Sequence, residues 1–186
     1  GGGTAIKDEK TAGKLLNQSD GHRHRRLRAL VQKGFTVTAI NKLEGDLRLK
    51  AKHLFARLKC GENVDFAKII APELPSHAIC TVLGVPKSDR LELCSWIDQG
   101  IEAESASVIA VEHLRKVRDY AKNLIAKKKA KPEEDIFSKI VHAKFEEDGS
   151  SLSDYELGSF FALLFPAGAE TTTRSISGGM LALLEN

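Results

Sequence analysis

Apolar side chains recur along most of this sequence at the three- and four-residue spacing that places them on one face of a helix. No segment alternates between apolar and polar residues with the period of two that a half-buried strand requires. The pattern therefore predicts an all-α fold. The predicted helices cover residues 20–34, 38–58, 67–83, 87–99, 105–129, 133–146 and 153–186.

The last predicted helix is the longest, and Ser153 followed three residues later by Glu156 marks its start with the spacing of a capping box. Residues 1–19 lack apolar periodicity, so we expect a flexible N-terminal arm or loop followed by a single helical domain over residues 20–186. The chain starts without the apolar core of a signal peptide, and its longest apolar run is shorter than the ~18 residues of a membrane span. We therefore expect a soluble, cytoplasmic protein with no membrane partner.

Composition narrows the functional classes only slightly. The net charge of +3 on 186 residues is too small to require a polyanionic partner. Cys60, Cys80 and Cys94 show no CxxC or Cys/His ligand spacing, which indicates reduced thiols and no metal site built from them. The lysine-rich stretch over residues 115–131 is typical of a solvated helix face, with a docking patch for an acidic protein as the alternative.

A basic run, His22–Arg28, is the first segment with a chemical pattern. His24 and Arg28 are four residues apart, so on a helix they share one face and can direct hydrogen-bond donors at a carboxylate or phosphate. The alternatives are a solvated basic face or a contact with nucleic acid, although the run has no interleaved aromatic residues. A non-enzymatic all-α binding module that uses this run is therefore a rival interpretation.

The second segment, Phe165–Thr173, is poorly composed for the helix that contains it. Pro166 cannot donate to the carbonyl of Ala162, and Gly168 permits a close approach to the backbone. Glu170 and the threonines after it offer a carboxylate and hydroxyl groups. These residues indicate a locally opened helix with a proton-relay pair. The alternative is an ordinary kinked helix whose threonines bond back to its own carbonyls.

Four segments in order resemble signatures of the bacterial cytochrome P450s, the haem-thiolate monooxygenases. They are Asp20–Thr36, similar to D-P-P-x-H-x-x-x-R with a trailing F-T; Leu83–Arg90, similar to L-L-G-V-P-x-x-D-R; Leu152–Leu157, similar to L-S-D-x-E-L; and Ala167–Thr172, similar to A-G-x-E-T-T. The resemblance extends from about residue 15 to the end of the sequence, with Gly21-His22 in place of Pro-Pro. It implies the all-α fold of that family.

The resemblance also implies roles for individual residues. His24 and Arg28 are similar to the pair that binds the haem propionates. Thr171 resembles the threonine that hydrogen-bonds dioxygen and helps to deliver protons, and Glu170 resembles its acidic neighbour in that relay. These two residues are the implied catalytic pair.

The remaining implied contacts lie in the same helix. Ala167 and Gly168 resemble the groove for dioxygen, and Thr172 completes the implied cofactor-binding set. By the same resemblance, Leu163 and Ala167 face haem and substrate. The implied reaction inserts one oxygen atom into an apolar organic molecule, with electrons delivered singly by a ferredoxin-type partner and the hard step carried by the cofactor.

The family's haem-ligating cysteine belongs to a loop with the pattern F-x-x-G-x-x-x-C-x-G, and the sequence up to Asn186 contains no such segment. We therefore expect a fragment that ends in the oxygen-binding helix and does not catalyse the reaction alone, because the iron lacks its axial thiolate. Apolar helix faces left without their partners favour association, so we also expect the fragment to self-associate.

Overall fold

The computed structural model describes residues 16–102 and 108–186. Within these ranges every regular element is helical, which confirms the all-α prediction. The α-helices are α1 (Gly21–Gln32), α2 (Val37–Phe55), α3 (Glu73–Val82), α4 (Arg90–Glu102), α5 (Val108–Ala130), α6 (Ile136–His142) and α7 (Asp154–Glu185), and the shorter helical turns are η1 (Leu16–Gln18), η2 (Phe66–Ile70) and η3 (Lys87–Asp89). Most of the predicted arm lies outside the described residues, but its last part forms η1.

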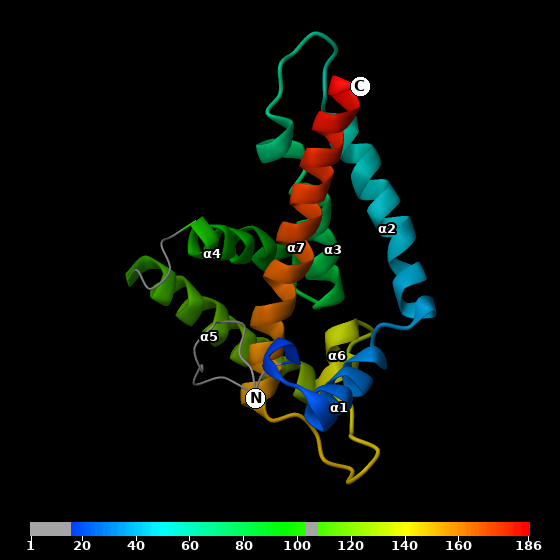
Figure 1. Ribbon diagram of the computed structural model, residues 1–186, viewed down its shortest axis with the longest axis vertical. Helices are drawn as coiled ribbons and strands as arrows, with labels where there is room; N and C mark the ends of the chain where they lie inside the picture. The colour runs from blue at the N-terminus through cyan, green and yellow to red at the C-terminus, as the bar shows by residue number, and fades with distance from the viewer. Residues whose placement is uncertain (1–15, 103–107) are drawn as a thin grey trace.

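Helix α7 is the predicted long helix, and it runs through the middle of the molecule with α3 on one side and α5 on another (Figure 1). The capping box at its start is confirmed. The Ser153 hydroxyl accepts a hydrogen bond from the Glu156 N–H at 3.3 Å, and the Glu156 carboxylate accepts one from the Ser153 N–H at 2.9 Å. Neither α7 nor another helix in the described part of the chain is long and apolar enough to cross a membrane.

The core lies where the first half of α7 meets α5 and α6. Phe137, Phe161 and Phe165 are fully buried there. The ring centroid of Phe161 lies 5.6 Å from that of Phe137 and 6.4 Å from that of Phe165, distances typical of favourable aromatic pairs. Each buried phenylalanine contributes roughly 1.5–3 kcal/mol of hydrophobic stabilisation. This cluster fixes the first half of α7 against the rest of the fold.

Several predicted helix boundaries were wrong by three residues or more, and two of these errors have a clear physical consequence. The predicted helix over residues 67–83 divides into η2 and α3, and α3 begins only after Pro72, because a proline has no N–H to donate within a helix. The predicted helix over residues 133–146 ends at His142. Beyond it the chain turns away so that the Phe145 ring lies under the Arg26 guanidinium, 4.0 Å from the ring centroid.

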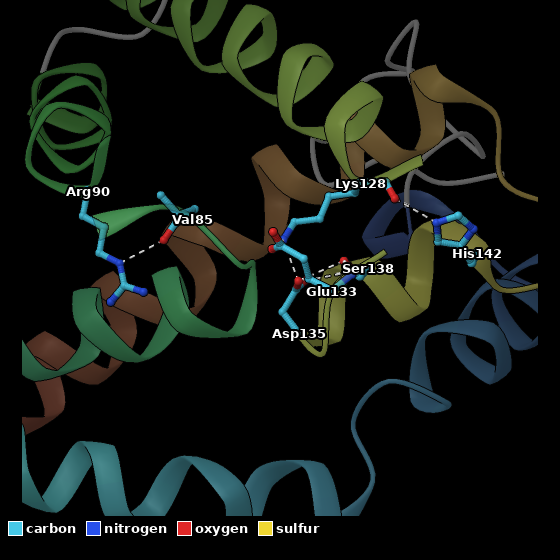
Figure 2. A network of polar contacts seen from close by, with 7 residues as sticks. All are labelled: Val85, Arg90, Lys128, Glu133, Asp135, Ser138 and His142. Carbon is cyan, nitrogen blue, oxygen red and sulfur yellow. Dashed lines mark hydrogen bonds and ion pairs between the residues drawn. The ribbon is translucent and has the colours of Figure 1, made fainter. Parts of the chain in front are cut away.

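The lysine-rich stretch of α5 is not uniformly solvated, because Lys128 is only 2% exposed. Its Nζ lies 2.5 Å from Asp135 Oδ2 and 2.6 Å from Glu133 Oε2 (Figure 2). Asp135 also caps α6, since its Oδ1 accepts a hydrogen bond from the Ser138 N–H at 2.7 Å. The buried cation thus has two carboxylate partners, which join the end of α5 to the start of α6.

The turn between α3 and η3 passes directly over this ion pair. Gly84 adopts a left-handed backbone conformation with φ of +61°, and a Cβ atom there would lie 2.3 Å from Lys128 Nζ. The next residue, Val85, is buried, and its carbonyl accepts a hydrogen bond from Arg90 Nε at 3.0 Å (Figure 2). Only glycine satisfies both the backbone conformation and the space beside Lys128.

We predict that Gly84→Ala destabilises the protein more than Gly149→Ala. Gly149 also has a positive φ of +67°, but nothing lies within 4 Å of a Cβ atom built there. The left-handed backbone alone costs alanine about 1–2 kcal/mol. Crowding against Lys128 and Asp135 adds about 1–3 kcal/mol at Gly84 only. Urea unfolding followed by helical circular dichroism measures both losses, and equal losses would contradict the close packing described here.

Candidate functional site

The basic run of the sequence forms the first turns of α1, and much of its charge is neutralised within the fold. Arg23 Nη2 lies 2.7 Å from Glu156 Oε1 at the start of α7, and Arg26 pairs with Asp148 in the loop before α7. Hydrogen bonds from the Ser150 hydroxyl and backbone N–H, together with Arg26, lower the pKa of Asp148 to about 2. These contacts fasten α1 to the beginning of α7.

His24 and Arg28 differ from these neighbours. The Nδ1–H of His24, which is half-buried, donates to the Leu16 carbonyl at 3.1 Å, so Nε2 is the ring nitrogen left to contact a ligand. Arg28 lies one turn further along α1, is exposed, and makes no hydrogen bond or ion pair with the residues that the structure describes. The two side chains remain available for an external anion.

A small cleft lies between the N-terminal segment, formed by η1 and α1, and the first half of α7. The ribbons of these elements lie close together at the lower end of Figure 1. Its apolar lining consists of Leu16, Leu27, Val31, Leu152, Phe160 and Leu163. Leu16 is the residue whose carbonyl holds the His24 ring, and Leu163 is a predicted substrate contact. The predicted substrate residue Leu163 thus lines the same cleft as Leu16, the residue that holds the predicted haem-binding histidine, although His24 itself does not line the cleft.

Helix α7 continues this side of the site beyond Leu163. At about 100° per residue, Ala167, Glu170 and Thr171 follow Leu163 on the same side of the helix. Ala167 and Thr171 are exposed, and Glu170 forms an ion pair with Arg174 one turn further on. Two predicted substrate residues and both predicted catalytic residues thus share an open face of α7.

Gly168 and Thr172 do not share that face. A Cβ atom at Gly168 would lie 2.9 Å from Ile79 Cδ1, so this glycine permits the close approach of α3 to α7. Thr172 lies about half a turn away from Leu163 around the helix axis. The haem-binding roles of these two residues therefore stay predictions, while the structure supplies a packing reason for Gly168.

The backbone of α7 is continuous through Pro166 rather than locally opened. The Thr171 hydroxyl donates to the Ala167 carbonyl at 2.6 Å, and the Thr172 hydroxyl donates to the Gly168 carbonyl at 3.1 Å. This is the arrangement that the alternative interpretation describes. Threonine hydroxyl groups satisfy main-chain carbonyls around the proline without a break in the helix.

Sequence reasoning missed Leu16, because it lies in a segment that was predicted to be a flexible arm. In the structure it belongs to η1, and Gln18 and Ser19 beside it are buried. The available signal was the apolar pair at residues 15 and 16 in an otherwise polar stretch. One such pair has no periodicity, so only the packing against α1 and α7 reveals its role.

This side of the molecule offers hydrogen-bond donors for carboxylate groups and an apolar surface, and no cysteine lines the cleft. His24 Nε2 and Arg28 can receive carboxylates, and Leu163 with Ala167 offers an apolar surface. The cysteines lie elsewhere. Cys60 is exposed beyond the end of α2, and Cys80 and Cys94 line a different cleft, between α3 and α4. None of the three residues lines the cleft beside Leu163.

An all-α fold built around one long capped helix, with these four segments in order, resembles the helical part of a haem-thiolate monooxygenase. Comparisons with known proteins agree. The chain is 42% identical, over its full length, to a Mycobacterium tuberculosis protein designated cytochrome P450 126, of which it covers 46%. It is 37% identical to a steroid C26-monooxygenase of Mycolicibacterium smegmatis, with 92% of the chain and 40% of that relative covered.

Solved structures show the same likeness. The Bacillus subtilis cytochrome P450 PksS of the bacillaene polyketide synthase superposes with a TM-score of 0.86 at 34% identity, over 95% of this chain and 45% of that one. No family model matches the sequence. The chain belongs to the cytochrome P450 family, and it spans less than half the length of the relatives that it matches.

We predict opposite effects for two glycine substitutions in α7. Gly178→Ala raises the free energy of unfolding by about 0.5–1 kcal/mol, because nothing lies within 4 Å of its Cβ position and alanine favours helix. Gly168→Ala lowers it by about 1–3 kcal/mol, because Ile79 must move. Ile79→Val removes the nearest crowding atom, Cδ1, so Gly168→Ala should cost less stability in that background than in the wild-type protein. Denaturant unfolding of the four variants measures this coupling, which would be absent if α3 did not contact Gly168.

Proposed function

We propose that the whole protein is a haem-dependent monooxygenase that inserts one oxygen atom into an apolar organic substrate. The observation that supports this proposal is the cleft between α1 and α7, which is lined by the predicted substrate residue Leu163 and by Leu16, whose carbonyl holds the His24 ring. His24 is held by Leu16 at the edge of that cleft, and Leu163 lines it one turn before Ala167. Membership of the cytochrome P450 family supplies the class of chemistry.

In this proposal α1 binds the acidic groups of the cofactor. The Arg28 guanidinium and the Nε2 of His24 in its protonated form hydrogen-bond the haem carboxylates. The bond from His24 Nδ1–H to the Leu16 carbonyl orients the ring for this contact. Haem, when bound, supplies the activation of dioxygen, and the protein positions it and delivers protons.

Thr171 and Glu170 are the proposed proton carriers. The Thr171 hydroxyl donates to the Ala167 carbonyl, so it must rotate away from that oxygen to give its proton to a group on the open face. Glu170, the preceding residue, is paired with Arg174 as a carboxylate, so it can replace the proton on Thr171 after it has left that arginine and has taken up a proton from solvent. Leu163 and Ala167 exclude water beside them and contact the apolar substrate.

We also propose partners and a cellular location for the protein. We propose a ferredoxin-type electron donor, since two electrons must arrive singly, and a cytoplasmic location. For the 186-residue chain by itself we propose self-association through the exposed end of α7, where Leu181, Leu183 and Leu184 are 56–79% exposed. Nucleic acid is not a proposed partner, because ion pairs within the fold occupy Arg23 and Arg26 of the basic run.

We predict that the reduced, haem-loaded whole protein shows a thiolate-type Soret band in its carbon monoxide difference spectrum. The 186-residue chain with added haem should not show this band, because none of its three cysteines lines the cleft beside Leu163. A thiolate band from the chain alone would contradict the expected inactivity of the chain. A whole protein without the band would contradict the proposed function.

We predict that Arg28→Ala weakens haem binding by the whole protein about 10- to 100-fold, the effect of losing one hydrogen bond to a charged group. Arg25→Ala is the matched control, because Arg25 is equally exposed on α1 but does not share the face of His24. Haem titration followed by absorbance measures both affinities. Equal losses in the two variants, or salt-sensitive retention on heparin that Arg28→Ala abolishes without a change in haem affinity, would favour the rival binding module.

A further inference from the structure

A second, larger cleft lies between α2, η2, α3 and α4, among residues to which the proposed function gives no role. Its volume is about 420 Å³, within the range of about 300–1,000 Å³ that is typical of small-molecule sites. Its lining combines basic side chains with apolar ones: Lys50, Lys68 and Arg90 are basic, and Ile69, Pro72 and Leu91 are apolar. This combination suits a ligand that carries an anionic group on an apolar body.

Arg90, the first residue of α4, is half-buried and has only neutral hydrogen-bond acceptors among the described residues. Its Nε donates to the Val85 carbonyl at 3.0 Å (Figure 2). Its Nη1 lies 3.2 Å from the Thr81 hydroxyl and 3.2 Å from His77 Nδ1, which accepts because arginine can only donate. No described residue accepts a hydrogen bond from Nη2, so these donors remain available for an anion in the cleft.

The acidic groups near the cleft do not cancel its positive charge. Asp46 contacts the other nitrogen of the His77 ring, where its Oδ2 accepts from Nε2 at 2.5 Å. Glu73 lines the cleft, but its carboxylate is shared by Lys50 at 2.7 Å and Arg57 at 3.9 Å. Three basic side chains of the described lining therefore face one carboxylate, and that carboxylate is already paired.

The apolar side chains of the cleft are open to solvent although they are large. Leu91 is 87% exposed and Ile69 is 48% exposed. Leu91 follows Arg90 at the start of α4, and Ile69 follows Lys68 in η2, so each apolar side chain is next in sequence to a basic one. A ligand with an apolar chain would remove this surface from water while its anionic end stays beside the basic groups.

We propose that this cleft binds a carboxylic acid with an apolar chain, such as a medium-chain fatty acid. The carboxylate accepts hydrogen bonds from Arg90 Nη2 and pairs with Lys68, and the chain covers Ile69 and Leu91. A neutral apolar molecule would leave the positive charge of the cleft uncompensated, and a small anion would leave its apolar side chains exposed. The site uses none of the residues proposed for haem binding and does not depend on them.

Cys94 is a built-in reporter of binding, because it is half-buried and lines the cleft, whereas Cys60 is exposed outside it. The whole haem-loaded protein is titrated with decanoate and given a short pulse of iodoacetamide, and tryptic peptides then report the alkylation of each cysteine. We expect saturating decanoate to remove most of the alkylation of Cys94 and to leave that of Cys60 unchanged. Decan-1-ol, which has no charge, and acetate, which has no apolar chain, should protect Cys94 far less.

Two lysine variants test the role of charge, with the decanoate affinity of the whole protein measured by titration calorimetry. Lys68→Ala should weaken binding about two- to fivefold, the effect of losing an exposed ion pair. Lys59→Ala is the matched control and should leave the affinity unchanged. Both lysines are exposed and lie near an acidic residue three positions away, but Lys59 does not line the cleft.

Several outcomes would overturn the proposal. Equal protection of Cys94 by decan-1-ol would show that the basic groups play no part, and equal losses of affinity in the two lysine variants would show that the cleft is not the site. A decanoate-induced shift of the Soret band without protection of Cys94 would place decanoate at the haem alone. Cys94 that is not alkylated even without decanoate would show that the whole protein closes the cleft to solutes.

Discussion

The buried ion pair between Lys128 and Asp135 determines how the helices that flank α7 are placed (Figure 2). A lysine at 2% exposure is tolerated only with a carboxylate beside it, since an unpaired buried charge costs several kcal/mol. The pair joins α5 to α6, and the Gly84 turn lies directly over it, so the turn that follows α3 is held beside the end of α5. From the same turn, Val85 and Arg90 set the start of α4. The ion pair therefore lies where the ends of α3 and α5 meet the start of α6 and the turn that leads to α4.

Helix α7 packs against α3 and α5, whose ends lie beside this ion pair. The two sides of α7 differ in what they contact. Toward α3 and the core it presents Gly168, which admits Ile79, and the buried ring of Phe165. On the other side it presents Leu163 and Thr171, which no core packing covers completely. A helix fixed by close packing on one side can hold groups on the other side in a constant position, which the proposed catalytic role of Glu170 and Thr171 requires.

Local signals predicted much of the fold, while the roles of the site residues stay predictions. The capping box at Ser153 and the apolar periodicity depend on neighbours in sequence, so the all-α class and the long helix could be predicted. The burial of Lys128 could not be predicted, because nothing in the sequence distinguishes it from the two neighbouring lysines. Only in the folded chain does Asp135 lie beside one of the three. Leu16 was missed for the same reason, since its contacts with α1 and α7 are distant in sequence.

The basic run of α1 shows how the fold selects a role from a pattern that allowed several. Arg23 and Arg26 are fastened to carboxylates at the start of α7, so their charges hold α1 in position. Arg28 has no such partner among the described residues, and His24 keeps one ring nitrogen for a ligand. A nucleic acid is bound by several free lysine or arginine side chains that contact its phosphate backbone. One planar cofactor with carboxylate groups needs only two or three directed hydrogen-bond donors. The distribution of ion pairs within this single helix therefore favours a small acidic ligand over a polyanion.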